Sequence, residues 1–92
     1  MRYDELVSYT GTGYPFQLRE NAFQFLSQIQ SFDRTSLRNL VEACTHHNWR
    51  FRENARNLLN QLVKEDRIKD IMDSVRPLLS KKELAYLERV NL

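Results

Sequence analysis

The sequence is poor in the residues that interrupt helices. Its 92 residues include only 2 glycines and 2 prolines, and Gly11, Gly13 and Pro15 lie close together near the start. From position 16 onward only Pro77 breaks a helix-compatible sequence. No segment alternates apolar and polar residues, and the Asn-Gly and Asp-Gly pairs typical of tight β-hairpins do not occur. We therefore expect an all-α chain.

Other scarcities exclude whole classes of function. One cysteine excludes an internal disulfide framework, and no apolar run approaches the ~20 residues of a membrane span, so no membrane partner is expected. A net charge of +2 is too small to imply nucleic acid or an anionic surface by itself. The sequence carries no catalytic motif that we can place, so function must be inferred from architecture.

The first 30 residues are expected to form two helices. The first is short, carries Leu6 and Val7, and ends at residues 11–13, where a residue with positive φ can cap it. Pro15 suits the first turn of the second helix. The apolar positions of that helix fall on one face, which predicts a continuous core stripe of Leu18, Ala22, Phe25, Leu26 and Ile29.

Two longer helices are expected in the middle of the chain. The first of them runs from about Thr35 to His46, with Asp33 or Thr35 as its N-cap. Asn48 is a plausible N-cap for the next helix. Its core stripe has the same spacing as that of the second helix: Phe51, Ala55, Leu58, Leu59 and Leu62.

The C-terminal third is expected to close the core. A helix that begins near Ile68 ends before Pro77, because proline disfavours α geometry at the residue that precedes it. Ser80 and Glu83 form a capping box that opens the last helix. That helix is charged on its outer side, as expected of a capping element.

Residues 18–29 and 51–62 are two copies of one pattern. Half of the twelve positions are identical at an offset of 33, namely Arg19/Arg52, Glu20/Glu53, Asn21/Asn54, Ala22/Ala55, Leu26/Leu59 and Gln28/Gln61. One structural unit, a helix hairpin, is therefore used twice. We expect one domain over residues 1–92, with hairpins at about 1–30 and 34–64 and a capping hairpin at about 66–92. Because the Arg-Glu-Asn sequence recurs with the repeat, we interpret its residues as packing contacts rather than as a binding site.

The repeated pattern resembles the second helix of HEAT-type repeats. That resemblance implies five to six helices in antiparallel hairpins, stacked as a short right-handed solenoid. The first helix is short and has no evident cap, so we expect the native polypeptide to continue upstream of Met1. An uncovered first hairpin would also allow the isolated chain to dimerise.

Basic side chains gather around one tryptophan. The candidate surface-binding residues are Arg34, Arg38, Trp49, Arg50 and Arg56, since basic residues interleaved with aromatics can bind phosphates and stack on bases. We favour the alternative that Trp49 packs and the arginines form a solvated face. The sequence Cys44-x-His46-His47 invites a metal interpretation, but adjacent helical residues diverge, and Cys44 continues an apolar stripe. No metal, cofactor or catalytic residue is assigned to this chain.

Three phrases resemble the C-terminal end of aminopeptidase-N-type zinc peptidases of the gluzincin group. They are residues 14–22, residues 40–51 and the closing Leu84-x-x-Leu87-Glu88-Arg89. The resemblance implies a non-catalytic helical domain that packs on a catalytic domain and restricts peptide access to its zinc. The His-Glu-x-x-His zinc motif would lie upstream, and the compartment, cytoplasmic or periplasmic, would depend on the parent's N-terminus.

Two hypotheses of other classes stay open. One is a stand-alone HEAT-like adaptor that binds a protein partner. The other is an Arg-rich nucleic-acid-binding module, which the small net charge disfavours.

Overall fold

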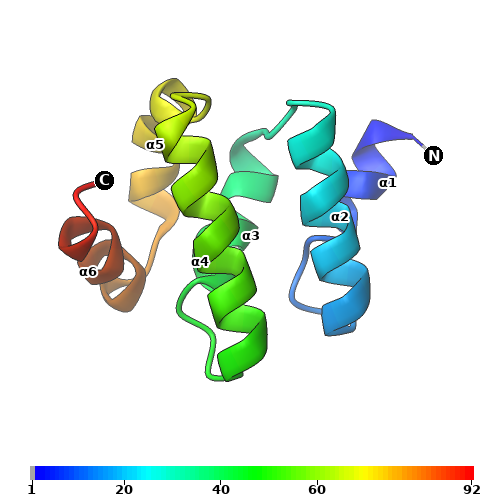
Figure 1. The fold of residues 1–92 in the computed structure, drawn as a ribbon, viewed down its shortest axis with the longest axis horizontal. Helices are drawn as coiled ribbons and strands as arrows, with labels where there is room; N and C mark the ends of the chain where they lie inside the picture. The colour runs from blue at the N-terminus through cyan, green and yellow to red at the C-terminus, as the bar shows by residue number, and fades with distance from the viewer. Residues whose placement is uncertain (1) are drawn as a thin grey trace.

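The computed structural model describes residues 2–92 as six α-helices and one 3-10 turn (Figure 1). The elements are α1 (Tyr3–Ser8), α2 (Phe16–Gln28), α3 (Arg34–Ala43), α4 (Trp49–Lys64), α5 (Lys69–Val75), η1 (Arg76–Leu78) and α6 (Lys81–Arg89). No strand occurs in this described range, so the all-α prediction is confirmed there. Met1, upstream of which we expect more chain, lies outside it.

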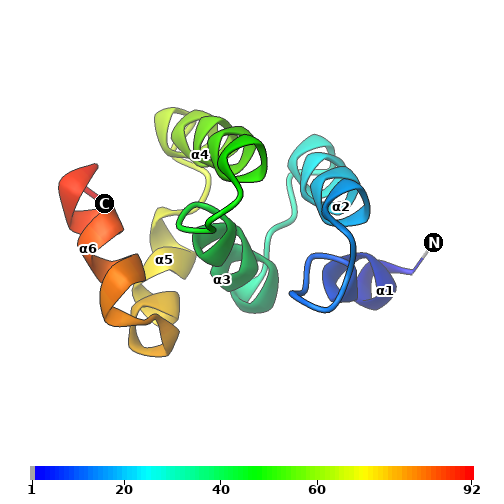
Figure 2. The same cartoon turned by 90° about the horizontal axis from the view of Figure 1, so that it is seen from below.

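The helices form two rows (Figure 2). α2 and α4 pack side by side in one row, and α1, α3 and α5 follow one another in the other. Each of α1 and α3 also packs against the helix that follows it in sequence, so the chain crosses between the rows in hairpins. α6 lies at the C-terminal end of the arrangement (Figure 2). None of the helices in residues 2–92 is both long and apolar enough to cross a membrane.

Side-chain caps fix where three helices begin. Asp33 accepts from the Ser36 amide at 2.8 Å, and the Ser36 hydroxyl accepts from the Asp33 amide, which makes Asp33 the N-cap of α3. Asn48 caps α4 by accepting from the Phe51 amide at 2.9 Å. The capping box of Ser80 and Glu83 opens α6 as expected. These local signals are confirmed.

Two expectations about the first connection are wrong. Neither glycine has positive φ, and the chain leaves α1 instead through tight turns in which the Thr10 and Gly11 amides donate to the carbonyls of Val7 and Ser8. Pro15 lies one residue before the helix, as the N-cap of α2 with extended backbone. A proline suits this position because its missing N–H would have no partner inside the helix.

The end of α3 differs from expectation, and so does the backbone beside Pro77, although α5 ends before that proline as expected. α3 ends at Ala43, and the chain then turns through Thr45 and His46 before α4 begins. Arg76 keeps right-handed helical geometry although Pro77 follows it. This geometry is possible because Arg76 begins the short 3-10 turn that carries Pro77 at its start.

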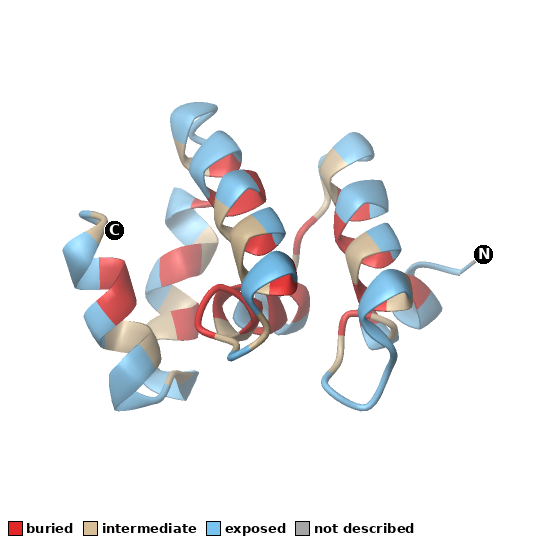
Figure 3. Ribbon diagram, turned by 60° about the horizontal axis from the view of Figure 1, so that its bottom comes forward, coloured by how far each residue is buried: buried red, intermediate tan, exposed pale blue. Residues whose placement is uncertain are grey.

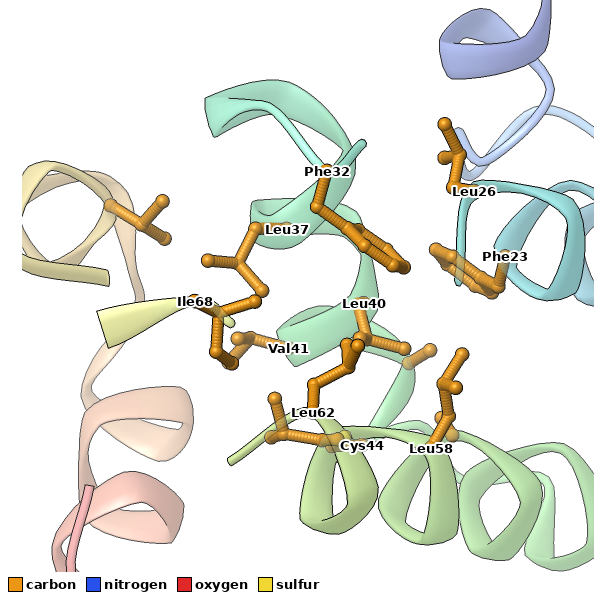
Figure 4. Close-up of a cluster of buried hydrophobic side chains, with 14 of the residues drawn as sticks. Phe23, Leu26, Phe32, Leu37, Leu40, Val41, Cys44, Leu58, Leu62 and Ile68 are labelled. Carbon is orange, nitrogen blue, oxygen red and sulfur yellow. The ribbon is translucent and has the colours of Figure 1, made fainter. Parts of the chain in front are cut away.

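The core lies between the two rows (Figure 4). Leu26 and Leu59, which occupy the same repeat position, are fully buried, as are Leu40 and Val41 of α3. Cys44 is also fully buried, which confirms its expected place in the apolar stripe. Burial raises the pKa of its thiol to about 12.

Part of the predicted core is exposed. Phe25 and Ile29 of the α2 stripe are 56% and 48% accessible (Figure 3 shows the burial along the ribbon). Trp49, which we expected to pack, is 68% accessible at the start of α4. Periodicity correctly identified an apolar face of α2, but it does not report whether a neighbouring element covers that face.

The buried thiol predicts a loss of stability in alkali. In the unfolded chain Cys44 ionises near pH 9, whereas its folded pKa is about 12, so the unfolded state loses the proton first as pH rises. We expect the free energy of unfolding to fall between about pH 9 and pH 12, by up to about 1.4 kcal/mol per pH unit. Urea titrations from pH 7 to pH 11 measure this slope.

Cys44→Ala provides the control for that slope. Burial also raises the pKa of Tyr86 to about 12, so a weaker alkaline decline should remain in the variant. Equal slopes in the two proteins would contradict a role for the buried thiol.

Candidate functional site

Arg19 is a charged side chain in the interior of the protein. It is 1% accessible, and its guanidinium lies 4.8 Å from the centroid of the Phe51 ring. Arg19 Nε donates to the Thr10 carbonyl oxygen at 2.9 Å, and Nη2 forms an ion pair with Glu42 Oε2 at 2.8 Å. One side chain of α2 thereby joins the turn after α1, the C-terminal end of α3 and the start of α4.

Thr10 extends this network into α3. Its hydroxyl donates to the Val7 carbonyl at 2.6 Å and accepts from Asn39 Nδ2 at 2.8 Å. Thr10 is fully buried and Asn39 nearly so. Buried polar groups are stable only when they are hydrogen-bonded, and both partners here meet that requirement.

In the second copy of the repeat, two arginines donate to backbone carbonyls that follow the preceding helix. Arg52, the counterpart of Arg19, donates through Nη1 to the His46 carbonyl at 3.1 Å. Arg56, one turn later, donates through Nε to the Cys44 carbonyl at 2.8 Å. In both copies an arginine of the second helix therefore donates to a backbone carbonyl in the turn that follows the first helix.

The repeated asparagines behave differently in the two copies. Asn54 Nδ2 donates to Glu20 Oε2 at 3.1 Å and so bridges α4 and α2. Asn21 accepts from Gln17 within its own helix at 3.0 Å. Ala22 and Ala55, the small residues of the pattern, are both buried.

A basic groove runs between α4, α6 and the loop that precedes α4. It has a volume of about 540 Å³, and its basic lining consists of Arg52, Arg56, Lys82 and Arg89, with His46 and His47 at the same groove. The Arg56 guanidinium lies 4.7 Å from the Tyr86 ring centroid, and that of Arg89 lies 5.6 Å from it on α6. Glu53 partly balances the charge, at 3.7 Å from both Arg52 and Arg56. The groove can attract anionic groups.

The structure distributes the predicted surface-binding residues among separate places. Arg34 begins α3 and Trp49 begins α4, so in an antiparallel hairpin they lie at opposite ends (Figure 1). Arg38 lines a different hollow, beside Glu42 and Glu83. Arg50 is exposed next to Trp49, and only Arg56 reaches the basic groove. The five residues therefore do not form one continuous surface.

The two histidines are held by aromatic contacts. The His46 ring lies 5.0 Å from that of Phe16 and 4.3 Å from that of His47. Burial and the neighbouring His47 lower the pKa of His46, and its Nδ1 accepts from the Asn48 amide at 3.0 Å. No group of three His, Cys, Asp or Glu side chains within residues 2–92 is arranged to hold a metal ion.

Sequence reasoning missed the long-range partners in these sites. Arg19 and Glu42 are 23 positions apart, and Arg56 and Tyr86 are 30 apart, so no local spacing pairs them. A signal for Arg19 was present in its recurrence as Arg52. Nothing in the sequence distinguished the copy that is buried from the copy that is half-buried.

Comparison with protein-family models, with curated proteins and with solved structures finds no match to this chain.

The two arginines of the repeat give a matched test of the buried network. In Arg19→Lys a single ammonium replaces a planar fork and cannot reach both the Thr10 carbonyl and Glu42. We expect the free energy of unfolding in urea to fall by about 2–3 kcal/mol. Arg52→Lys should cost less than about 1 kcal/mol, because water reaches this half-buried side chain. Equal losses would contradict a special role for Arg19.

Proposed function

We propose that this chain is a non-catalytic helical-repeat domain, the C-terminal part of a larger zinc aminopeptidase. In this proposal the hairpins form a short right-handed HEAT-like solenoid that packs on the catalytic domain and narrows the route by which peptides reach the zinc. The sequence stretches 14–22, 40–51 and 84–89 suggest the family. The zinc, its ligands and the catalytic groups belong to the upstream part of the parent protein.

The observation that carries the repeat-domain part is the side-by-side packing of α2 and α4. Both helices come from one repeated sequence pattern, and both bury the same alanine and leucine positions against the neighbouring helices: Ala22, Leu26, Ala55 and Leu59. An arrangement in which each hairpin packs on the next is typical of solenoids, whose exposed surfaces serve to contact other proteins or domains.

The buried network is consistent with a scaffold. Arg19 donates to the Thr10 carbonyl and forms an ion pair with Glu42. These contacts fix the angle between the hairpins and leave the charge unavailable to a ligand. A rigid repeat domain of this kind can hold a shaped surface against a partner. That property is what a role in restricting access would require.

A second candidate, the stand-alone adaptor, is favoured by the basic groove. Four permanent cations, Arg52, Arg56, Lys82 and Arg89, line it and offer a site for an acidic segment of a protein partner. The nucleic-acid hypothesis stays a prediction; of the five residues on which it depends, only Arg56 lines the basic groove.

The peptidase proposal is tested by two preparations. The purified 92-residue chain should not hydrolyse aminoacyl p-nitroanilides with or without added zinc, whereas the polypeptide encoded by the complete gene should do so in a zinc-dependent manner. Robust turnover by the short chain would overturn the proposal. A complete gene without an upstream His-Glu-x-x-His motif would favour the adaptor.

A further inference from the structure

Apolar residues of the α2 repeat are exposed, whereas the residues at the same repeat positions of α4 are buried. Phe25 and Ile29 are 56% and 48% accessible, whereas their repeat counterparts Leu58 and Leu62 are 5% and 0% accessible. Leu18 is half-buried, but its counterpart Phe51 is buried. The sequence pattern is the same in both helices, so the difference comes from what lies beside each of them.

In α4 the corresponding side is covered by α2. Leu58 lies in a small hollow between the two helices with Phe23 and Gln24 of α2, and Figure 4 shows Leu58 on the side of α4 that faces Phe23. On the opposite side of α2 no second helix of this kind is present within residues 2–92 (Figure 2). α2 therefore carries the same kind of surface that α4 uses to contact α2, but no such helix covers it within residues 2–92.

A hydrogen bond also joins α4 to α2 on these sides. Asn54, on the side of α4 that α2 covers, donates to the Glu20 carboxylate of α2 at 3.1 Å. Its counterpart Asn21 is exposed, and no hydrogen bond from its amide nitrogen occurs within residues 2–92. By the same geometry, a helix placed beside α2 would meet Asn21 with a carboxylate.

We propose that the outer face of α2, formed by Leu18, Asn21 and Phe25, is the docking surface for one further helical hairpin of the same repeat type. The second helix of that hairpin lies beside α2 as α2 lies beside α4, and it carries an Asp or Glu that accepts from Asn21. The inference rests on the proposed function in one respect: the hairpin belongs to the parent polypeptide.

A second copy of this chain fits the face less well. In a symmetric pair the outer face of α2 would meet itself, and the single carboxylate of α2, Glu20, is already bound by Asn54 on the opposite side. Asn21 would then meet no carboxylate. The polar contact therefore favours a hairpin of the α1–α2 type, which turns its glutamate toward the helix that follows.

The test places a photo-crosslinker at the centre of this face. The polypeptide encoded by the complete gene is prepared with p-benzoylphenylalanine in place of Phe25, irradiated, and its crosslinked peptides are mapped by mass spectrometry. We expect an intramolecular crosslink to a helical segment shortly upstream of Met1 that contains Asp or Glu. The crosslink should be lost in the isolated 92-residue chain.

The same crosslinker in place of Gln61 is the matched control. Gln61 is exposed and lines the groove between α4 and α2, so it should crosslink to α2 in both the complete polypeptide and the isolated chain. Success at position 61 shows that the fold and the chemistry are intact. An absent crosslink at position 25, a crosslink to a second copy, or one to a distant domain would then overturn the inference.

Failure of the proposed function gives a different result. If the complete polypeptide has no peptidase activity but crosslinks from position 25 to an upstream hairpin, the docking surface stands and the aminopeptidase assignment fails. If activity is present and the crosslink falls elsewhere, the assignment stands and the docking surface fails.

Discussion

The buried guanidinium of Arg19 is the constraint on which the arrangement of the hairpins depends. It belongs to α2, yet its partners are the carbonyl that follows α1 and a carboxylate of α3, and Phe51 of α4 lies beside it. A charge this deeply buried is tolerated only while all of these groups stay in place. The crossing of the first hairpin and its contact with the second are thereby fixed together.

The two copies of the repeat share this solution but differ where their neighbours differ. The position held by Phe23 in α2, which packs toward the next hairpin, is held by Arg56 in α4. Arg56 lies over the ring of Tyr86 and binds the carbonyl that follows α3. At this repeat position a cation-π contact with Tyr86 of α6 takes the place of the apolar side chain, and the basic groove lies beside that contact.

The sequence was sufficient for the local features and insufficient for the long-range ones. Helical periodicity and the short-range capping residues Asp33 and Ser80 act within one turn, so they could be predicted. The pairing of Arg19 with Glu42 spans 23 positions and depends on how the helices cross. The exposure of Phe25 could not be predicted, because periodicity identifies an apolar face and says nothing of its neighbour.

The central claim is that a further helix covers the outer face of α2, as α2 covers the corresponding face of α4. Hydrogen exchange, measured by mass spectrometry on the isolated chain and on the polypeptide encoded by the complete gene, tests this claim most directly. The account predicts that amides of α2 (Phe16–Gln28) exchange more slowly in the complete polypeptide, whereas those of α4 (Trp49–Lys64) exchange equally in both. Equal exchange of α2 in the two proteins would contradict it.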